Sequence, residues 1–306
     1  MTTYDLHQHL WPAALIELLH RRKEPPFLRG SALTTREGRF PFDLREHDLE
    51  RRIAALDAAG IDVAVVSLQP TLGFEELPVP ERRQLLTTYN DGVAELVEAA
   101  GGRLHALAAG EPRPGFAGVC VGASRLLDLN GLKPILDRLE QNEGFLFVHP
   151  DAAQAAPARP GWWPALVDYT AGMQTSYLAW IEHGAARWPN LNVVFALLAG
   201  GAPFQLERLQ SRGVDTGRLT SLPLFFETSS YGRLSLELCL ATYGIDRIVH
   251  GSDLPVIDPA HTMSAIRALG KAATHAICDR NPRSLLHDHR ELSLGAHPER
   301  AQPVPV

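Results

Sequence analysis

The sequence predicts an α/β fold, a single-domain (β/α)8 TIM barrel. Short apolar runs alternate with longer segments of helical spacing along the 306 residues. Alternation of this kind is typical of βα units around a parallel sheet. A count near eight favours a closed barrel. The first run is not followed by a glycine-rich loop, which argues against a nucleotide-binding doubly wound sheet.

Each expected strand is a short apolar or β-branched run that ends in a turn or in a polar side chain. The runs are Tyr4–His9, Val63–Gln69, Leu104–Glu111, Gly118–Ala123, Phe145–His149, Val193–Leu198, Leu224–Thr228 and Arg247–Gly251. Active sites of such barrels lie at the carboxyl ends of the strands. The side chains that end these runs are therefore the first candidates for function.

Segments with helical spacing lie between the expected strands. They are His47–Ala59, Glu81–Ala99, Leu132–Asn142, Trp162–Arg187, Phe204–Arg212, Leu234–Tyr243 and about Pro259 to His275. The barrel is expected to span residues 1–290. Residues 24–44, with several Pro and Gly, read as a long loop over the barrel mouth, and residues 291–306 read as a C-terminal tail.

Composition narrows the class of protein. Hydrophobic residues make up 45% and charged residues 21%, with a net charge of −6, which argues against general nucleic-acid binding. No stretch of about 18 apolar residues exists, so no membrane span is expected. Strand-like sequence begins by Tyr4, leaving no room for a signal peptide. Three widely spaced cysteines, Cys120, Cys239 and Cys278, are typical of reduced thiols in a cytoplasmic protein.

Two histidines end the first expected strand. His7 and His9 are two residues apart, so both imidazoles project from the same face of a strand and can reach one ion. Asp5 shares that face and is a candidate to orient a ligand histidine. An HxH pair is by itself a weak signal, and its position at the end of the first barrel strand strengthens it.

Two further candidate ligands end later strands. His149 follows the apolar run FLFV, and Asp253 follows IVHGS. Taken singly, His149 reads equally as a hydrogen-bonded strand-end histidine, and Asp253 as a turn carboxylate. Together with His7 and His9 they form the nitrogen and oxygen donor set of a divalent metal site. The sequence thus predicts one metal ion at the mouth.

The order and spacing of these motifs resemble a known family. DLHQH, DAAGIDVAVVS, FLFVHP and GIDRIVHGSDLP are similar to segments of the amidohydrolase superfamily, in the branch typified by aminocarboxymuconate-semialdehyde decarboxylase. The resemblance runs over nearly the whole chain. It implies that His7, His9, His149 and Asp253 bind one divalent ion, with Zn2+ as first choice and Mn2+ or Fe2+ as alternatives. It also implies hydrolysis of lactones and amides, or decarboxylation of unsaturated or aromatic acids.

The sixth expected strand departs from the family pattern. Members carry a histidine there, followed by one residue and a glycine pair, whereas this chain has Leu198 before Ala199-Gly200-Gly201. That histidine normally activates metal-bound water or polarises the substrate, and leucine can do neither. If the strand is regular, Val194, Ala196 and Leu198 share its inward face. We therefore expect Leu198 at the level of the metal.

Other groups are candidates to take over the missing acid–base role. Asp253 is best placed, because a metal-bound carboxylate can also accept a proton from water. His250 is expected to point to the opposite face of its strand. Glu227 is expected to support the mouth through hydrogen bonds, and Asp151 to shape a loop.

Several further side chains are candidates for substrate contact. Trp11 and Trp162 follow strand ends and are pocket candidates, although helix-start or core packing explains them equally well. Arginines are candidates for binding a substrate carboxylate, and surface roles are commoner. They are Arg51, Arg52 and Arg125. His47 reads as a helix-start residue with a smaller claim to a site role.

Three functions remain open at this level. The first is a metal-dependent hydrolase or carboxy-lyase that acts on a small organic molecule. The second is a degenerate barrel that binds a metal or ligand but has low catalytic turnover. Leu198, in place of the expected histidine, is the feature that supports this alternative. The third is a metal-free enzyme on the same scaffold. The expected partner is a small-molecule substrate, with a homodimer left open.

Overall fold

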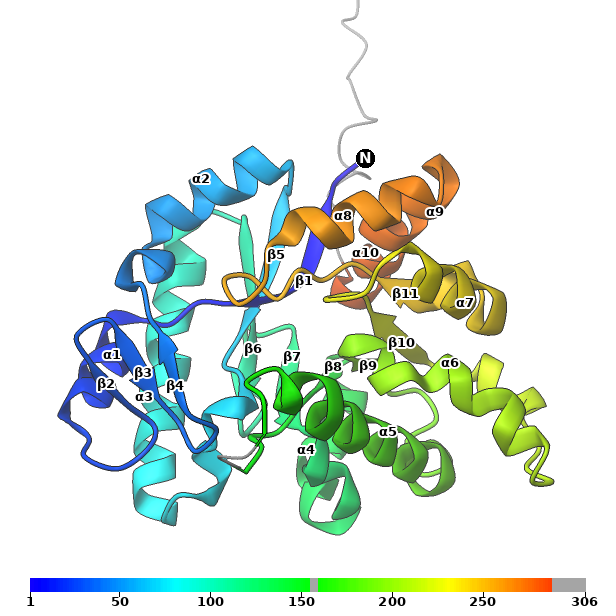
Figure 1. Cartoon of the computed structure of the whole chain (residues 1–306), viewed down its shortest axis with the longest axis horizontal. Coiled ribbons are helices and arrows are strands. Elements are labelled where there is room, and N and C mark those ends of the chain that lie inside the picture. Colours follow the sequence, from blue (N-terminus) through cyan, green and yellow to red (C-terminus); the bar gives the residue numbers. More distant parts are fainter. Residues whose placement is uncertain (155–158, 288–306) are drawn as a thin grey trace, which may run out of the picture.

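Eight parallel strands form the centre of the protein. The computed structural model describes residues 1–154 and 159–287, and the expected tail at 291–306 lies outside them. The sheet order is β1-β5-β6-β7-β8-β9-β10-β11, with helices around it (Figure 1). The strands are β1 (Tyr4–His9), β5 (Val63–Ser67), β6 (Leu104–Ala109), β7 (Gly118–Gly122), β8 (Phe145–His149), β9 (Val193–Phe195), β10 (Leu224–Glu227) and β11 (Ile248–Val249). The predicted barrel is confirmed.

The barrel closes where the first strand meets the segment after the last one. His250 accepts a backbone hydrogen bond from Leu6 (2.9 Å), and His7 accepts one from Asp253 (2.8 Å). Leu254 then accepts one from His9 (2.7 Å). These bonds continue the parallel ladder and bring Asp253 beside the two histidines of β1.

Helices cover the outer face of the barrel. They are α1 (Ala13–Arg21), α2 (Leu49–Ala59), α3 (Val79–Ala99), α4 (Leu129–Gln141), α5 (Tyr169–Ala179), α6 (Leu197–Gln210), α7 (Arg233–Tyr243), α8 (Pro259–Ala268), α9 (Lys271–His275) and α10 (Asn281–Leu286). Local signals set several ends. Asp48 caps α2 by accepting from the Arg51 N–H, and Gly60 ends it with a left-handed φ of 71°.

The segment at 24–44 contains a small sheet where the sequence predicts a long loop. β2 (Phe27–Arg29), β3 (Ala32–Thr34) and β4 (Arg39–Pro41) pair antiparallel in sequence order. Arg29 pairs with Ala32 across a two-residue turn, which Gly30 enters with a φ of 56°. Strands this short contain no recognisable apolar run, because they are stabilised by pairing with neighbouring strands and not by a local sequence pattern.

The sixth barrel strand is shorter than predicted. β9 ends at Phe195, and the five residues 197–201 then all have positive φ. Leu198, with φ 48° and ψ 36°, therefore lies in a left-handed turn, and the prediction that it continues the inward face of a strand is wrong. Gly200 and Gly201 adopt this conformation at low cost. Leu198 is buried, with 1% of its surface exposed.

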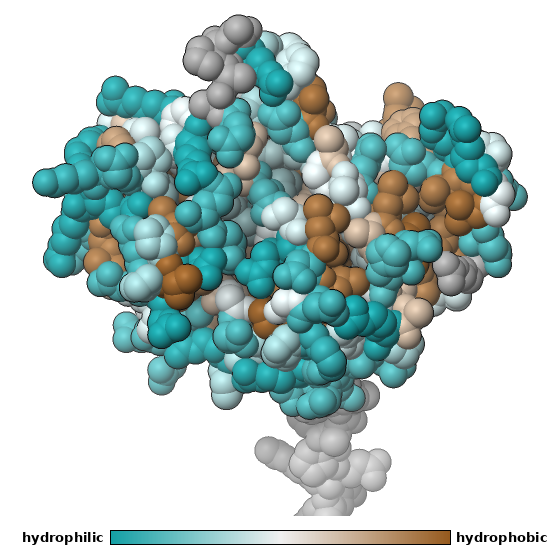
Figure 2. Space-filling model, turned by 90° about the horizontal axis from the view of Figure 1, so that it is seen from below, coloured by the Kyte–Doolittle hydropathy of each residue, from teal (hydrophilic) through white to brown (hydrophobic). Residues whose placement is uncertain are grey.

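The surface is mostly hydrophilic, with scattered hydrophobic patches on the face that Figure 2 shows. Exposed apolar side chains include Trp162, Leu166 and Phe204. Among the described residues, no helix has both the length and the apolar character that a membrane crossing requires. The three cysteines are free and buried.

We predict that Gly200→Ala destabilises the protein more than Gly101→Ala. Both glycines have left-handed φ, 64° and 58°, so alanine costs about 1–2 kcal/mol at either site. A Cβ at Gly101 meets open space, whereas a Cβ at Gly200 collides with the Thr170 carbonyl oxygen. The clash should add about 1–3 kcal/mol in urea unfolding. Equal losses for the two variants would contradict this account of the turn.

Candidate metal centre

Four predicted ligands converge at the carboxyl end of the barrel. One ligand atom from each of His7, His9, His149 and Asp253 lies within 4.8 Å of the others. The two histidines of β1 project together, His149 ends β8, and Asp253 follows β11. Strands far apart in the sequence therefore place the donors of one site, as barrel topology requires.

Each imidazole is oriented through its Nδ1 atom. The Nδ1 of His9 lies 3.1 Å from the Ser67 carbonyl oxygen, and that of His149 lies 2.9 Å from the Pro150 carbonyl oxygen. The Nδ1 of His7 lies 3.1 Å from Glu227 Oε2. Because all three partners are acceptors, each Nδ1 carries a proton, and in the neutral ring Nε2 keeps the free lone pair. This arrangement is typical of metal-binding histidines.

The atoms that face one another lack hydrogen-bond partners. Nε2 of His7, Nε2 of His9 and Oδ1 of Asp253 are buried without one among the described residues. The Asp253 oxygen lies 3.0 Å from His9 Nε2 and 3.6 Å from His7 Nε2. Buried polar atoms without partners cost free energy, and a cation between them would satisfy all three.

The electrostatics of the cluster favour a cation. Burial lowers the pKa of His7, but the carboxylates of Glu227 and Asp253 outweigh it and raise this pKa to about 9. Burial together with the neighbouring imidazoles lowers the pKa of His149 well below its ordinary value. Burial raises the pKa of Asp253, yet His7 and His9 outweigh it and lower it. The field that attracts a proton to His7 also attracts a divalent ion.

The donor set fits a divalent metal. Three imidazole nitrogens and one carboxylate suit zinc, manganese or iron, and coordination requires the neutral histidines that the Nδ1 bonds prepare. Asp253 keeps 13% of its side chain exposed, against 1% for His7 and for His9. The carboxylate thus lies on the open side of the cluster, where a small molecule can approach.

Glu227 supports the centre from β10. It is fully buried, and its Oε2 contacts His7 and accepts from Ser229 Oγ (2.9 Å) and from the Leu197 N–H (3.3 Å). The left-handed turn that holds Leu198 is therefore tied to the carboxylate that orients His7. Asp5, by contrast, accepts from the backbone N–H groups of His7 and Ser252 and bonds no ligand ring.

A cavity of about 500 Å³ opens at the barrel mouth. Trp11, Gln69, Tyr169 and Pro255 line it, together with side chains of the segment at 33–47. The segment is held to the barrel by Glu37, which accepts from Tyr169 Oη (2.5 Å) and from the Ala153 N–H (2.7 Å). These contacts lie on loops that follow barrel strands.

The other predicted site residues lie apart from the cluster. Trp162 is 56% exposed, stacks on Trp163 and does not line the described part of the mouth cavity. Asp151 accepts from the Ser124 N–H, and His250 Nδ1 lies 2.9 Å from the Tyr4 carbonyl oxygen.

The three candidate arginines have protein partners. Arg51 pairs with Glu46, and Arg125 pairs with Glu75. Arg52 is buried and donates to Gln8 Oε1 and to the carbonyls of His9 and Glu46.

His47 and Gln69, which have a small or no part in the sequence prediction of the site, both line the mouth cavity. His47 ends η1 (Leu44–His47) and lies against Trp11 at the mouth. Gln69 ends a predicted strand, so its position was the available signal. His47 gave no such signal, because only tertiary packing brings the loop before α2 over the barrel.

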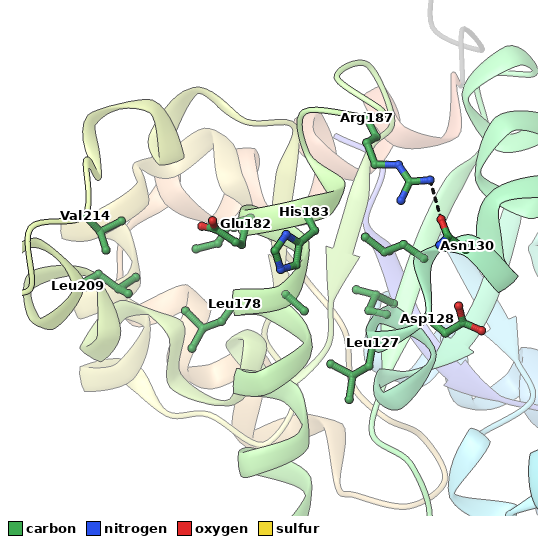
Figure 3. A pocket seen from close by; sticks show the side chains of 13 residues that line it. Leu127, Asp128, Asn130, Leu178, Glu182, His183, Arg187, Leu209 and Val214 are labelled. Atoms are coloured by element: carbon green, nitrogen blue, oxygen red, sulfur yellow. Dashed lines mark hydrogen bonds between the residues drawn. The ribbon is translucent and has the colours of Figure 1, made fainter.

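Figure 3 shows a second cavity, of about 680 Å³. Leu127, Leu178 and Leu209 line it, from η4 (Ala123–Leu127), α5 and α6. Arg187 donates to Asn130 Oδ1 (3.2 Å) at its edge. None of the four cluster residues is among its described lining.

Solved structures share this fold. IDCase from Metarhizium anisopliae in its apo form has a TM-score of 0.76 at 19% identity, over 94% of this chain and 97% of that chain. A 2,6-dihydroxybenzoate decarboxylase from Rhizobium gives 0.71 at 17%, over 94% and 99%. The 5-carboxyvanillate decarboxylase of Novosphingobium aromaticivorans DSM 12444, complexed with manganese and 4-hydroxy-3-methoxy-5-nitrobenzoic acid, gives 0.73 at 18%, over 94% and 96%. The TM-scores establish a common fold, and at identities this low the likeness establishes nothing beyond the fold.

The family assignment comes from the sequence itself. None of the curated proteins compared with this chain matches it. The sequence model of the family described as Amidohydrolase matches residues 4–287, which is nearly the whole described chain. The match includes all four residues of the metal cluster and agrees with the resemblance that the motifs indicate. The chain therefore belongs to the amidohydrolase family.

Proposed function

We propose that this protein is a metal-dependent carboxy-lyase that removes CO2 from a planar aromatic or unsaturated acid. The metal is a single divalent ion held by His7, His9, His149 and Asp253, with zinc as first choice and Mn2+ or Fe2+ as alternatives. The observation that carries the proposal is the convergence of these donors near a cavity of about 500 Å³, whose lining residues Trp11 and Pro255 lie two positions after His9 and Asp253 in the sequence. Structural neighbours that decarboxylate aromatic acids support it.

The reaction needs little from the protein beyond binding and one proton. The C–C bond to the carboxylate breaks, its electron pair stays on the ring carbon, and that carbon takes up a proton. A bound divalent ion would supply positive charge that holds the substrate's oxygens. Asp253, the most exposed of the two carboxylates at the centre, is the group placed to deliver the proton. No attacking water is required.

Leu198 fits decarboxylation better than hydrolysis. Hydrolysis requires an activated water, and general base help is typically worth ~10²–10⁴-fold in rate. Leucine cannot provide it at the position where relatives carry histidine. The turn at residues 197–201 still bonds Glu227, which also contacts His7, so Leu198 lies in a turn that is tied to the metal cluster.

Hydrolysis of a small ester, lactone or amide is the second candidate. The exposed carboxylate of Asp253 favours it, because that group could accept a proton from water at the metal. A homodimer stays a proposal, which light scattering would test. A cytoplasmic location stays a prediction.

We predict about one divalent metal ion per chain in the purified protein, by elemental analysis. His7→Ala with His9→Ala should abolish binding while far-UV circular dichroism stays unchanged, because the barrel has its own core. Glu227→Gln should weaken metal affinity ~10–100-fold, since it removes the charge that orients His7. Protein that takes up no stoichiometric zinc, manganese or iron after reconstitution would refute the metal centre.

We predict metal-dependent CO2 release from planar acids, with 2,6-dihydroxybenzoate and 5-carboxyvanillate as first probes. In D2O the product should carry deuterium at the vacated carbon, because the proton comes from solvent through Asp253. Asp253→Asn should lose at least ~10²-fold in rate. Ester or lactone hydrolysis without decarboxylation of any acid would favour the second candidate.

We predict that Leu198→His raises ester hydrolysis without raising metal affinity. Histidine tolerates the left-handed φ of 48° at this position better than most residues, so the turn should persist. Leu197→His is the matched control, because it adds the same side chain one residue earlier in the same turn. Efficient hydrolysis by the unmodified protein, or equal gains in both variants, would contradict this reading of Leu198.

A further inference from the structure

Trp11 ties two polar side chains to the wall of the mouth cavity. Its backbone N–H donates to His47 Nδ1 at 3.0 Å, and its indole N–H donates to Gln69 Oε1 at 2.8 Å. The Trp11 and His47 rings stack with centroids 4.7 Å apart and an interplanar angle of 18°. Phe42 stacks on both rings, which fixes their orientation further.

These bonds leave both side chains as donors. With His47 Nδ1 accepting from Trp11, the proton of a neutral imidazole sits on Nε2. With Gln69 Oε1 accepting from the indole, the amide NH2 of Gln69 is left to donate to another group. The described residues offer no recorded hydrogen-bond partner to either of these nitrogens.

Both donors belong to residues that line the mouth cavity. Its lining also includes Trp11 and Pro255, which lie two positions after the cluster residues His9 and Asp253. Three carboxylates also line this cavity, and each is already engaged. Glu37 accepts from Tyr169, Asp43 pairs with Arg45, and Glu46 pairs with Arg51. His47 and Gln69 are therefore two polar side chains of this wall that each keep a donor for a ligand.

We propose that His47 and Gln69 form a neutral donor pair that binds an oxygen of the planar acid held in the mouth cavity. Trp11 positions the pair, and the stacked rings give the wall a flat apolar surface. The inference rests on the proposed function, because it takes the mouth cavity as the substrate site. Two neutral donors select a carboxylate, phenolate or nitro oxygen and offer nothing to an ammonium group.

If folding holds His47 neutral, the free energy of unfolding must depend on pH. Burial and the charge of the nearby Arg52 guanidinium lower the pKa of His47 to about 3, although Asp43 opposes this. Between pH 6.5 and about 3 the unfolded chain binds a proton that the folded protein does not, so stability falls as the pH falls. Between pH 7 and pH 4 the loss should be about 2–4 kcal/mol. His47→Asn should remove this component; an unchanged pH dependence would show that His47 is not held neutral.

Binding of 4-hydroxy-3-methoxy-5-nitrobenzoic acid to the metal-reconstituted protein, followed by calorimetry, tests the donor pair. His47→Asn keeps an acceptor for the Trp11 N–H but loses the Nε2 donor, and should weaken binding about tenfold. His47→Gln restores an amide N–H near the Nε2 position and should recover part of the affinity. Gln69→Glu keeps the acceptor for the indole, replaces the donor by a negative charge, and should weaken binding more than tenfold.

Asp43→Asn is the matched control, since it alters an engaged carboxylate on the same wall and should change affinity less than twofold. Thermal unfolding identifies any variant that loses its fold, and the remaining variants then decide. Unchanged affinity in the His47 and Gln69 variants, or no binding by the unmodified protein, overturns the inference. Binding that depends on the donor pair without CO2 release upholds the inference and counts against the proposed carboxy-lyase. If the unmodified protein releases CO2 and both His47→Asn and Gln69→Glu release it at the same rate, the carboxy-lyase is upheld and the donor pair is refuted.

Discussion

The backbone ladder between β1 and the segment after β11 is the constraint on which the site depends. It closes the barrel, and its register sets Asp253 against His7 and His9. The carboxylate reaches the imidazoles because Asp253 adopts a left-handed φ of 61° and turns out of the strand direction. A slip of one residue in this register would send the ligands to opposite faces. Closure of the fold and assembly of the metal centre are thus one event.

Around this constraint, a layer of acceptors decides which atoms stay free. The three Nδ1 atoms donate hydrogen bonds to Ser67, Pro150 and Glu227, which leaves the Nε2 atoms for the side of the ring that faces the cluster. Glu227 also holds the turn of Leu197, so the atypical sixth strand and the first metal ligand share one buried carboxylate. Such coupling suggests a reason why the site geometry persists although an apolar residue replaces the usual histidine.

At the barrel mouth, hydrogen bonds again orient side chains. Trp11, two residues after His9, directs His47 and Gln69 through its two N–H groups. The small sheet of β2, β3 and β4 brings Phe42 and Glu37 over the opening, and Glu37 bonds Tyr169 and Ala153 on the far side. The clustered donors come from β1, from β8 and from the segment after β11, while the side chains that we propose to bind a substrate come from segments that follow β1 and β5. Barrel enzymes divide rigid support and specificity in this way.

The sequence by itself determined the barrel, the ends of β1 and β8, and the four clustered side chains, because strand period and motif order are local properties. The early end of β9 could not be predicted, since the left-handed turn at Leu198 depends on a packed Thr170 carbonyl and on Glu227. The small sheet before α2 escaped for a similar reason, because its strands are three residues long and stable only through pairing. The hydrogen-bond partners of His47 and Gln69 were decided by tertiary structure alone. A side chain becomes a donor or an acceptor only when folding assigns its other atom a partner.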